Sequence, residues 1–434
     1  MKKSSSFSLL SSLFIFFYVF CSSLQLVVKA DVPASKTFKY VNEGMDFFGM
    51  VEHNADYRPL KIQNYPFRLC FFNSTPDSYI LGLGMGNANS TSLMRWVWTA
   101  NHARPVHNKA KLIFSRNGNL ELVDADGRVA WQTRTANKGV VDIKLLPNGN
   151  LVLIDRKGVF VWQSFDYPTD TLLVGQGFQL GSTGLTNGAY SMVLDTKEVN
   201  LFYKSPLSVK PLRYSNLVRS QDGDGELRNV SFNIAPTADG PDYADELRLE
   251  YENTHRGPIR GTQPKYNSTL SIFRLGSDGN LRIYTYYEKG RQDVWEETYT
   301  EFTSSWYAGE CLLPEKCGSL GICENSQCVA CPTPKGLMGW SKDCKPMKLP
   351  SCKVGAANVS YYRVDGVDHF LDTNNDGQGP MKIDECRRKC SSDCKCMAFF
   401  YRKDISMCLL TVQLNTLIKA QDSAERVSYI KYVK

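Results

Sequence analysis

The sequence lacks the signatures on which enzyme catalysis most often depends. Its five histidines lie in scattered contexts, without metal-ligand spacing and without a Gly-x-Ser-x-Gly elbow nearby. The stretch Gly82–Gly86 lacks the last spacing of a dinucleotide fingerprint, and no βαβ pattern surrounds it. We therefore predict that the chain is not an enzyme, with no catalytic residue, no metal and no cofactor.

After residue 30 the sequence also lacks any apolar run that approaches the ~20 residues of a transmembrane helix. Within residues 1–30, two lysines precede a short apolar run, and Val28-Lys29-Ala30 fits the small-residue rule for signal peptidase. We predict a cleaved signal peptide, and an uncleaved membrane anchor is the alternative. Residues 429–434 carry neither a lipid-anchor tail nor a retention tetrapeptide, so a secreted chain without a membrane anchor is expected.

The chain also lacks a large excess of one sign of charge, with 51 Lys and Arg against 44 Asp and Glu. Loss of residues 1–30, with Lys2, Lys3 and Lys29, lowers the formal net charge from +7 to +4. This excess is too diffuse to indicate nucleic-acid binding, but it suits a protein among acidic wall polysaccharides. With 42% hydrophobic and 22% charged residues in 434 positions, the chain is expected to form two to four globular domains.

Cysteine is almost absent from the first 310 residues and abundant afterwards. Cys21 leaves with the signal peptide, Cys70 stands alone, and twelve cysteines lie between Cys311 and Cys408. This usage indicates an oxidising compartment and disulfides rather than zinc. Cys70 follows Leu69 in an apolar run, which favours a buried thiol over a bridge between chains, although both stay open. Five triplets predict N-glycosylation of Asn73, Asn89, Asn229, Asn267 and Asn358.

A pattern of turns and short strands recurs in the part of the chain that precedes the cysteine-rich region. Asn117-Gly118-Asn119 and Asn148-Gly149-Asn150 each precede a β-rich run, a second glycine turn and a Trp-Gln pair. Such turns are the strongest short-range hairpin signal, because both central residues must tolerate positive φ. Ser277-Asp278-Gly279-Asn280 begins a third copy. We therefore predict a mainly β protein with an internal repeat. The one clear helix is predicted near Cys386 and Cys390, whose spacing of four places them on one helix face.

Two further motifs make the chain recognisable. Arg95-Trp96-Val97-Trp98-Thr99-Ala100-Asn101 leads to Pro105-Val106, and Val161–Leu173 reads Val-Trp-Gln-Ser-Phe-Asp-Tyr-Pro-Thr-Asp-Thr-Leu-Leu. Both resemble the signatures of the bulb-type (G-type) lectin domains in plant S-locus glycoproteins. The resemblance covers the mature chain and points to the secreted epidermis-specific glycoproteins, a branch with EGF-like and PAN/apple domains.

The resemblance implies a fold of tandem bulb-type β-prism (β-prism II) domains, followed by a disulfide-rich module and an α+β PAN/apple domain. The expected order is a signal peptide (1–30), a lectin domain (31–180), a second lectin-like β domain (181–305), an EGF-like module (306–348) and a PAN/apple domain (349–434). It also implies the PAN pairs Cys386–Cys408 and Cys390–Cys396, with Cys352 and Cys394 left as the third pair. For the EGF-like module, Cys311–Cys323, Cys317–Cys328 and Cys331–Cys344 are one choice among fifteen connectivities.

In this lectin family a strand with Gln-x-Asp-x-Asn-x-Val-x-Tyr holds a mannose, because alternate residues project from one face of the strand. The third copy keeps three of these positions, as Asp278, Asn280 and Tyr284, which are the predicted sugar contacts. The first two copies are more worn, and their weaker candidates are Asn117, Asn119, Asn148, Asn150 and Val152. The alternative is that these turns need Asn and Gly for structural reasons. We favour it for the first two copies and leave both interpretations open for the third.

The leading hypothesis is a secreted, non-catalytic glycoprotein of the plant cell wall or apoplast that binds mannose-type glycans or glycoproteins. The rival is an adaptor or structural wall protein that binds a protein partner through the PAN and EGF-like modules, with degenerate sugar pockets. The sequence leaves open whether the chain forms a homo-oligomer.

Overall fold

The computed structural model describes residues 31–88, 93–219, 221, 223–236, 243–260, 263–264, 268–288, 294–303, 309–349, 359–371 and 376–433. The predicted signal peptide lies outside these residues. The described residues fall into two compact units, one from the segments Met1–Glu43, Val106–Lys144 and Val152–Trp162, the other from Gly44–Pro105, Leu145–Leu151 and Gln163–Lys434. Within the described residues, no helix combines the length and the apolar character that crossing a membrane requires.

The fold is mostly β, as predicted, and the first unit contains a four-stranded antiparallel sheet in the order β1-β6-β7-β8. Leu120 and Leu122 of β7 are buried, whereas Glu121 and Val123 between them are half exposed, which is the alternation of a one-sided sheet. The strands of this sheet are β1 (Phe38–Val41), β6 (Lys111–Phe114), β7 (Leu120–Val123) and β8 (Val129–Gln132).

Two further sheets are formed by strands between residues 56 and 163. One has the order β2-β3-β4-β5 and the other β11-β10-β9. Their strands are β2 (Asp56–Asn64), β3 (Phe67–Thr75), β4 (Ser78–Met85), β5 (Arg95–Thr99), β9 (Asp142–Leu145), β10 (Leu151–Ile154) and β11 (Phe160–Gln163). Short 3-10 turns lie at η1 (Ala34–Lys36), η2 (Glu52–Asn54) and η3 (Ser164–Asp166).

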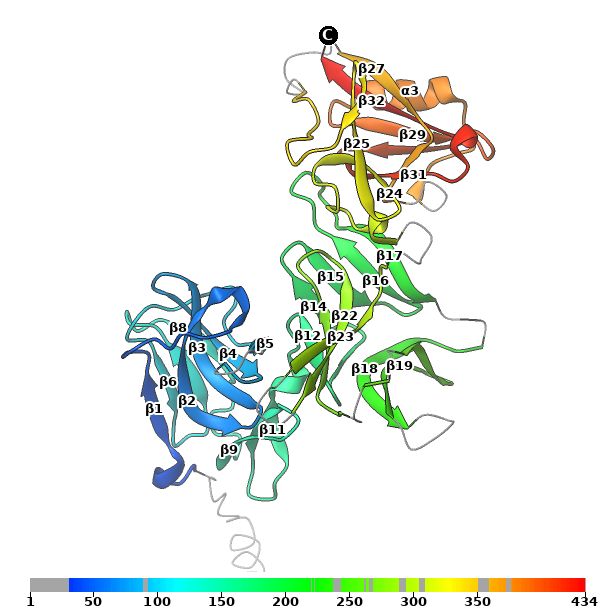
Figure 1. The fold of residues 1–434 in the computed structure, drawn as a ribbon. Coiled ribbons are helices and arrows are strands. Elements are labelled where there is room, and N and C mark those ends of the chain that lie inside the picture. Colours follow the sequence, from blue (N-terminus) through cyan, green and yellow to red (C-terminus); the bar gives the residue numbers. More distant parts are fainter. Residues whose placement is uncertain are drawn as a thin grey trace, which may run out of the picture. The chain divides into compact units, whose positions relative to one another are not determined.

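A second β region forms three four-stranded sheets around one core (Figure 1). The consecutive strands β12 (Thr171–Leu173), β13 (Gly177–Gln179) and β14 (Leu185–Asn187) each join a different sheet. The sheets are β12-β21-β22-β23, β13-β18-β19-β20 and β14-β15-β16-β17. This three-sheet plan agrees with the β-prism expectation, and the predicted domain boundary at residue 180 stays a prediction.

Each of the three sheets contributes buried side chains, such as Phe273, Phe232 and Leu201, to the common core. The remaining strands of this region are β15 (Tyr190–Leu194), β16 (Glu198–Tyr203), β17 (Leu212–Arg219), β18 (Leu227–Pro236), β19 (Tyr243–Tyr251), β20 (His255–Arg260), β21 (Ser271–Leu275), β22 (Leu281–Tyr287) and β23 (Val294–Thr300).

The cysteine-rich module, described for residues 309–349, does not form a separate sheet. Its strands β24 (Leu320–Glu324), β25 (Gln327–Thr333) and β26 (Gly336–Gly339) continue into β31 (Asn415–Lys419) and β28 (Val367–His369) of the PAN-like region. The junction is the parallel pair β24–β31. The module begins with the 3-10 turn η5 (Gly309–Leu312). Its assignment as EGF-like stays a prediction.

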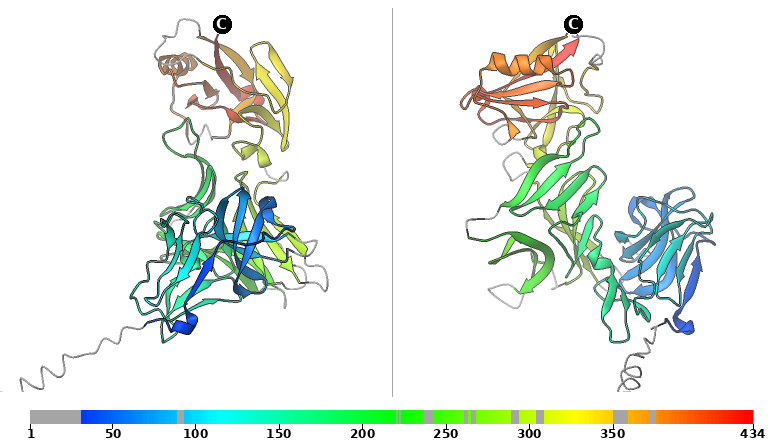
Figure 2. Two further views of the ribbon diagram at one scale, coloured as in Figure 1. Left: turned by 90° about the vertical axis from the view of Figure 1, so that its left-hand side faces the viewer. Right: turned by 180° about the vertical axis from the view of Figure 1, so that it is seen from behind.

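The PAN-like region adds a four-stranded sheet with one helix against it. The sheet has the order β27-β32-β29-β30, and α3 (Ile383–Ser392) lies along it (Figure 2). The strands are β27 (Val359–Asp365), β29 (Ala398–Arg402), β30 (Met407–Thr411) and β32 (Arg426–Val433), with the turn η6 (Ser423–Glu425) before β32. Among the described residues, α3 is the α-helix that the sequence predicted.

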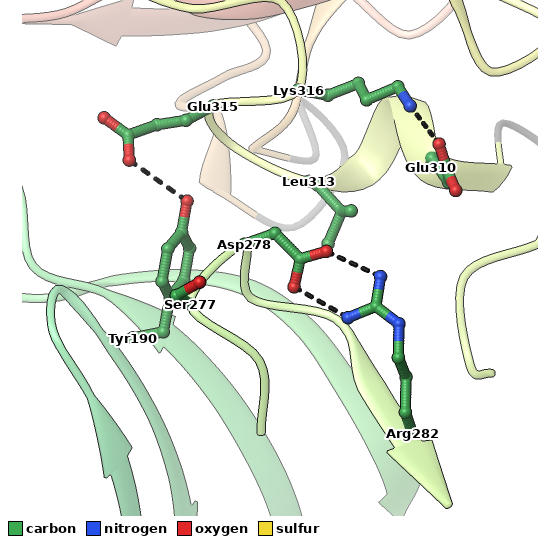
Figure 3. A pocket seen from close by; sticks show the side chains of 8 residues that line it. All are labelled: Tyr190, Ser277, Asp278, Arg282, Glu310, Leu313, Glu315 and Lys316. Atoms are coloured by element: carbon green, nitrogen blue, oxygen red, sulfur yellow. Dashed lines mark hydrogen bonds and ion pairs between the residues drawn. The ribbon is translucent and has the colours of Figure 1, made fainter. Parts of the chain in front are cut away.

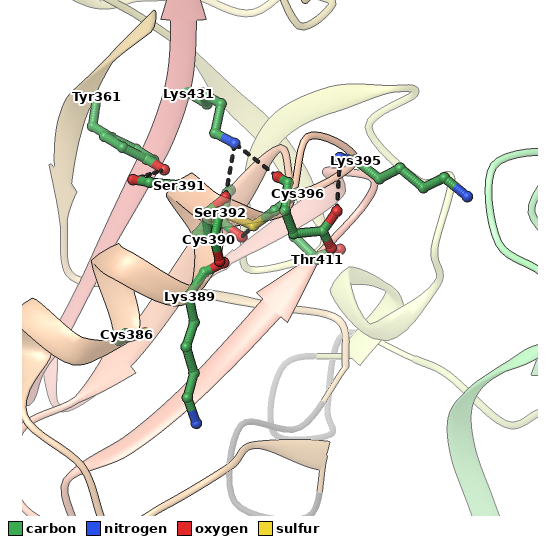
Figure 4. Close-up of a disulfide and its surroundings, with 12 residues drawn as sticks. Tyr361, Cys386, Lys389, Cys390, Ser391, Ser392, Lys395, Cys396, Thr411 and Lys431 are labelled. Carbon is green, nitrogen blue, oxygen red and sulfur yellow. Dashed lines mark hydrogen bonds between the residues drawn. A yellow bond between two sulfur atoms is a disulfide. The ribbon is translucent and has the colours of Figure 1, made fainter. Parts of the chain in front are cut away.

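Disulfides hold α3 against this sheet. Cys386 and Cys390, one turn apart and both fully buried, bond to Cys408 and Cys396. At the carboxyl end of the helix the Lys431 ammonium donates hydrogen bonds to the carbonyls of Cys390 (2.9 Å) and Asp393 (3.2 Å), where the helix dipole favours a cation (Figure 4). The cysteine-rich module contains three further disulfides, Cys311–Cys323, Cys317–Cys328 and Cys331–Cys344.

These five disulfides are the same pairs that the sequence analysis gave. The sixth expected pair, Cys352–Cys394, includes Cys352, which lies outside the described residues.

Candidate functional site

The three sequence copies adopt the same hairpin turn. In each, the central glycine has a φ of 84°, and its N–H bonds the carbonyl three residues earlier, at Ser115, Leu146 and Gly276. The side-chain oxygens of Asn117, Asn148 and Asp278 accept the backbone N–H two residues later, at 2.9, 3.2 and 3.0 Å. Positive φ alone disfavours a side chain at these glycines. Lack of space disfavours a side chain there as well, because a Cβ would lie 2.7 Å from the nearest side-chain atom at Gly118 and Gly149, and 2.6 Å from the Tyr190 ring at Gly279.

The asparagine after each glycine is buried and clamps the hairpin. Asn119, Asn150 and Asn280 are 6%, 3% and 0% exposed. The Asn280 amide donates to the Phe302 carbonyl (3.1 Å), and its oxygen accepts the N–H groups of Phe302 (3.0 Å) and Leu281 (2.9 Å). The Asn119 oxygen accepts the N–H of Thr135, and the Asn150 oxygen that of Phe165, in the same manner. All three asparagines therefore have a structural role in the folded chain.

Tyr284, the other well-preserved motif residue, is held by an ion cluster. The Arg95 guanidinium lies 4.0 Å above its ring, a cation–π contact. Arg95 and Arg274 each bond Glu52 Oε1 at 2.6 Å, and both Glu52 and Arg274 are largely buried. Burial alone would raise the pKa of Glu52, but the two guanidiniums hold it below its usual value. Tyr284 consequently packs against charged neighbours on its own face of β22.

Asp278 differs from its counterparts Asn117 and Asn148 because it forms an ion pair. Arg282, four residues later, bonds both carboxylate oxygens, at 2.9 and 2.6 Å. Partial burial raises the pKa of Asp278, but the hydrogen bonds from Arg282 and from the Asn280 N–H outweigh it, so the pKa is lowered. Near neutral pH the Asp278 carboxylate is therefore charged, and its position is fixed by Arg282.

Asp278 and Arg282 line a pocket of about 480 Å³ (Figure 3). The opposite wall comes from the cysteine-rich module, and Tyr190 of β15 lies between them. The lining residues are Tyr190, Ser277, Asp278, Arg282, Glu310, Leu313, Glu315 and Lys316. The structure thus brings one of the three main sequence candidates to the pocket, Asp278, while Asn280 supports the turn and Tyr284 does not line the cavity.

The wall from the module is held in place by its own contacts. Glu315 accepts hydrogen bonds from the hydroxyls of Tyr190 (3.2 Å) and Tyr203 (2.9 Å). Burial, and then the Glu315 carboxylate, raise the pKa of Tyr203 to about 12. Lys316 pairs with Glu310. Sequence reasoning missed these residues, because Tyr190 and Glu315 stand 125 positions apart and belong to no shared motif.

The weaker candidates have a different setting. Asn117 and Asn148 are exposed turn residues, and Val152 of β10 is fully buried. Within the described residues, no group of three or more His, Cys, Asp or Glu side chains could hold a metal ion.

The comparisons with known proteins agree with this architecture. A family model described as D-mannose binding lectin matches residues 95–192, and one described as PAN-like domain matches residues 360–414. EP1-like glycoprotein 2 of Arabidopsis thaliana is 42% identical, over 94% of this chain and 96% of its own length. The chain belongs to the EP1-like glycoprotein family.

Other relatives place this family among lectin-domain proteins. The epidermis-specific secreted glycoprotein EP1 of Daucus carota is 47% identical over 77% of this chain and 92% of its own length. A G-type lectin S-receptor-like serine/threonine-protein kinase of Arabidopsis thaliana is 26% identical over 87% of this chain, but over 45% of its own length. The resemblance stated from the sequence motifs is therefore confirmed.

Two of the five predicted glycosylation sites of this EP1-like chain lie within the described residues. Asn73 is 7% exposed on β3, and the Asn229 amide on β18 donates to Glu250 at 3.1 Å. An N-linked glycan is attached at the side-chain amide of the asparagine, so the side chains of Asn73 and Asn229 must both turn outward to carry one. Asn89, Asn267 and Asn358 lie outside the described residues, and the glycosylation sites stay predictions.

Cys70 is a free and fully buried thiol in the sheet β2-β3-β4-β5. Burial raises its pKa to about 12, so the reactive thiolate is suppressed. Of the two interpretations left open by the sequence, this geometry favours the buried thiol over a bridge between chains.

Proposed function

We propose that this chain is a secreted glycoprotein of the plant cell wall or apoplast that binds mannose-type glycans, and that the pocket at Asp278 is its sugar site. The match to the D-mannose binding lectin model and the name of the secreted carrot relative support the proposal. A cleaved signal peptide accounts for secretion. Cell-fractionation of plant tissue that expresses the tagged chain tests the location, and retention inside the cell contradicts it.

The observation that carries the proposal is the composition of the pocket. Its volume of about 480 Å³ lies within the ~300–1,000 Å³ typical of ligand sites. Sugar hydroxyls both donate and accept, and the pocket offers carboxylate acceptors at Asp278 and Glu310 together with donors at Arg282 and Lys316. Leu313 adds an apolar surface for ring carbons.

In this proposal the motif residues divide their roles. Asp278 contacts the sugar, since its side chain is 46% exposed while its position is fixed by Arg282. Asn280 holds the turn that presents Asp278, and Tyr284 holds the strand against Arg95. Asn117, Asn119, Asn148 and Asn150 serve the same turn and clamp roles in the other copies.

Calorimetric titration of the secreted, glycan-trimmed protein with a branched mannose oligosaccharide tests the site. Asp278→Asn keeps the turn, since Asn fills this position in the other copies, but it removes the charge. We expect roughly tenfold weaker binding, the loss of one charge-assisted hydrogen bond. Asp126→Asn is the matched control, because Asp126 also precedes a glycine and accepts the N–H of residue 128 at 2.9 Å.

If both variants bind like the wild type, the sugar site lies elsewhere; if the wild type shows no saturable binding, the proposed function is wrong.

A second candidate function is that of a protein-binding adaptor, and a second pocket favours it. This apolar pocket of about 570 Å³ is lined by residues that include Leu207, Met347, Lys348 and Lys395. Its lysines suit a peptide with an apolar side chain beside acidic residues.

Pull-down of a protein partner after enzymatic removal of the partner's glycans, lost with Leu207→Asp, supports the adaptor. Loss of the interaction on glycan removal instead supports the lectin.

A further inference from the structure

The wall of the sugar pocket that comes from the cysteine-rich module is fixed by the PAN-like region. Strand β24 of the module pairs in parallel with β31, from Leu320 opposite Asn415 to Cys323 opposite Ile418. The two parts thus share one sheet, β26-β25-β24-β31-β28. A displacement of β31 therefore carries the module with it.

Thr416 makes this connection local to the pocket. Its fully buried hydroxyl donates to the Pro314 carbonyl (2.9 Å) and accepts the Cys317 N–H (3.1 Å). Its own N–H bonds the same Pro314 carbonyl at 2.9 Å. Between Pro314 and Cys317 lie the two residues Glu315 and Lys316, both of which line the pocket.

Three further restraints fix the same segment. Cys317 is bonded to Cys328, and Cys311, next to Glu310, is bonded to Cys323. The Glu315 carboxylate is held by two tyrosine hydroxyls of the second β region. Side chains positioned in this way lose little further freedom when a ligand binds, which is the condition for specific recognition.

We propose that the sugar pocket is a composite site, in which Glu310 and Lys316 of the cysteine-rich module contact the glycan directly and Thr416 of the PAN-like region positions them. The inference rests on the proposed function of the Asp278 pocket. It assigns a binding role to residues outside the lectin repeat.

The composition of the composite site also selects the ligand. Three carboxylates, at Asp278, Glu310 and Glu315, face two cations, at Arg282 and Lys316. A uronate ring would bring a further negative charge among them, whereas neutral hydroxyls meet both donors and acceptors. The volume equals that of about 16 water molecules at ~30 Å³ each, more than one hexose ring fills. The ligand is therefore a neutral oligosaccharide that extends from Asp278 to the module.

The test is calorimetric titration of the full secreted chain with a branched mannose oligosaccharide, with free mannose, and with an oligogalacturonide as competitor. Glu310→Gln and Lys316→Met should each weaken oligosaccharide binding about tenfold and change free-mannose binding less than twofold, since the single ring stays near Asp278. Lys342→Met, an exposed lysine of the same module outside the pocket, should bind like the wild type. The oligogalacturonide should not compete.

Thr416 is tested by rescue. Thr416→Val removes both hydroxyl bonds at constant volume and should weaken oligosaccharide binding, whereas Thr416→Ser should restore it. If Asp278→Asn weakens binding but Glu310→Gln and Lys316→Met do not, the composite site is wrong and the lectin function stands. If the wild type binds no glycan, both proposals fail. Competition by the oligogalacturonide overturns the assignment of a neutral ligand.

Discussion

Replacement of Asn280 by alanine separates a structural asparagine from a sugar contact. Its side chain is fully buried and makes three hydrogen bonds, two of them to the backbone of Phe302 after β23 and one to Leu281. Asn280→Ala leaves the N–H and the carbonyl of Phe302 without these partners in a buried setting. Solvent cannot replace the amide there without opening the hairpin.

The size of the effect follows from these bonds. An intramolecular hydrogen bond contributes about 1 kcal/mol net, and an orphaned buried polar group costs about 1–3 kcal/mol. Partial relaxation around the small cavity lowers the sum, so we expect Asn280→Ala to destabilise the second β region by about 3 kcal/mol. For a region of roughly 150 residues this corresponds to a fall of about 6–12 °C in melting temperature.

Differential scanning calorimetry of the secreted protein measures this fall. Asn148→Ala is the control, because Asn148 is exposed and accepts one turn hydrogen bond, so a change of at most about 1 kcal/mol is expected. An unchanged melting temperature together with lost glycan binding would refute the reasoning, since Asn280 would then be a ligand contact and not a clamp.

Three other outcomes follow from buried groups. Glu52→Gln breaks the cluster with Arg95 and Arg274, and it should lower the free energy of unfolding by about 3–5 kcal/mol in denaturant titration. Because the folded-state pKa of Glu52 is lowered, the wild type keeps this contribution at neutral pH and loses it as the pH falls through that pKa. Burial raises the pKa of Asp245 to about 7, so the melting temperature should fall as pH rises from 4 to 8, and Asp245→Asn should flatten the profile. Cys70 should resist iodoacetamide in the native chain and react after unfolding; modification of the native chain would contradict its burial.

The sequence predicted those features of the fold that arise from neighbours in the chain. Gly118, Gly149 and Gly279 need positive φ, so the Asn-Gly and Asp-Gly pairs reveal the turns directly. The spacing of Cys386 and Cys390 reveals the helix in the same way. The pocket escaped prediction because its wall at Glu310, Glu315 and Lys316 joins Asp278 and Arg282 only through tertiary packing, which no local sequence pattern records.

The three turns share a backbone conformation but differ in charge, and two positions account for the difference: Asp278 stands where the other copies have Asn117 and Asn148. Two residues after the clamping asparagine stand Glu121, Val152 and Arg282. Arg282 reaches back to Asp278 and makes it a fixed carboxylate, whereas Val152 is buried and Glu121 lies 3.4 Å from the Asn119 amide. A repeat can therefore keep its hairpins for folding while two side chains, Asp278 and Arg282, give one copy a fixed charged site. By this argument Arg282→Val should release Asp278, raise its pKa and weaken glycan binding while the turn persists; unchanged binding would show that the ion pair has no part in recognition.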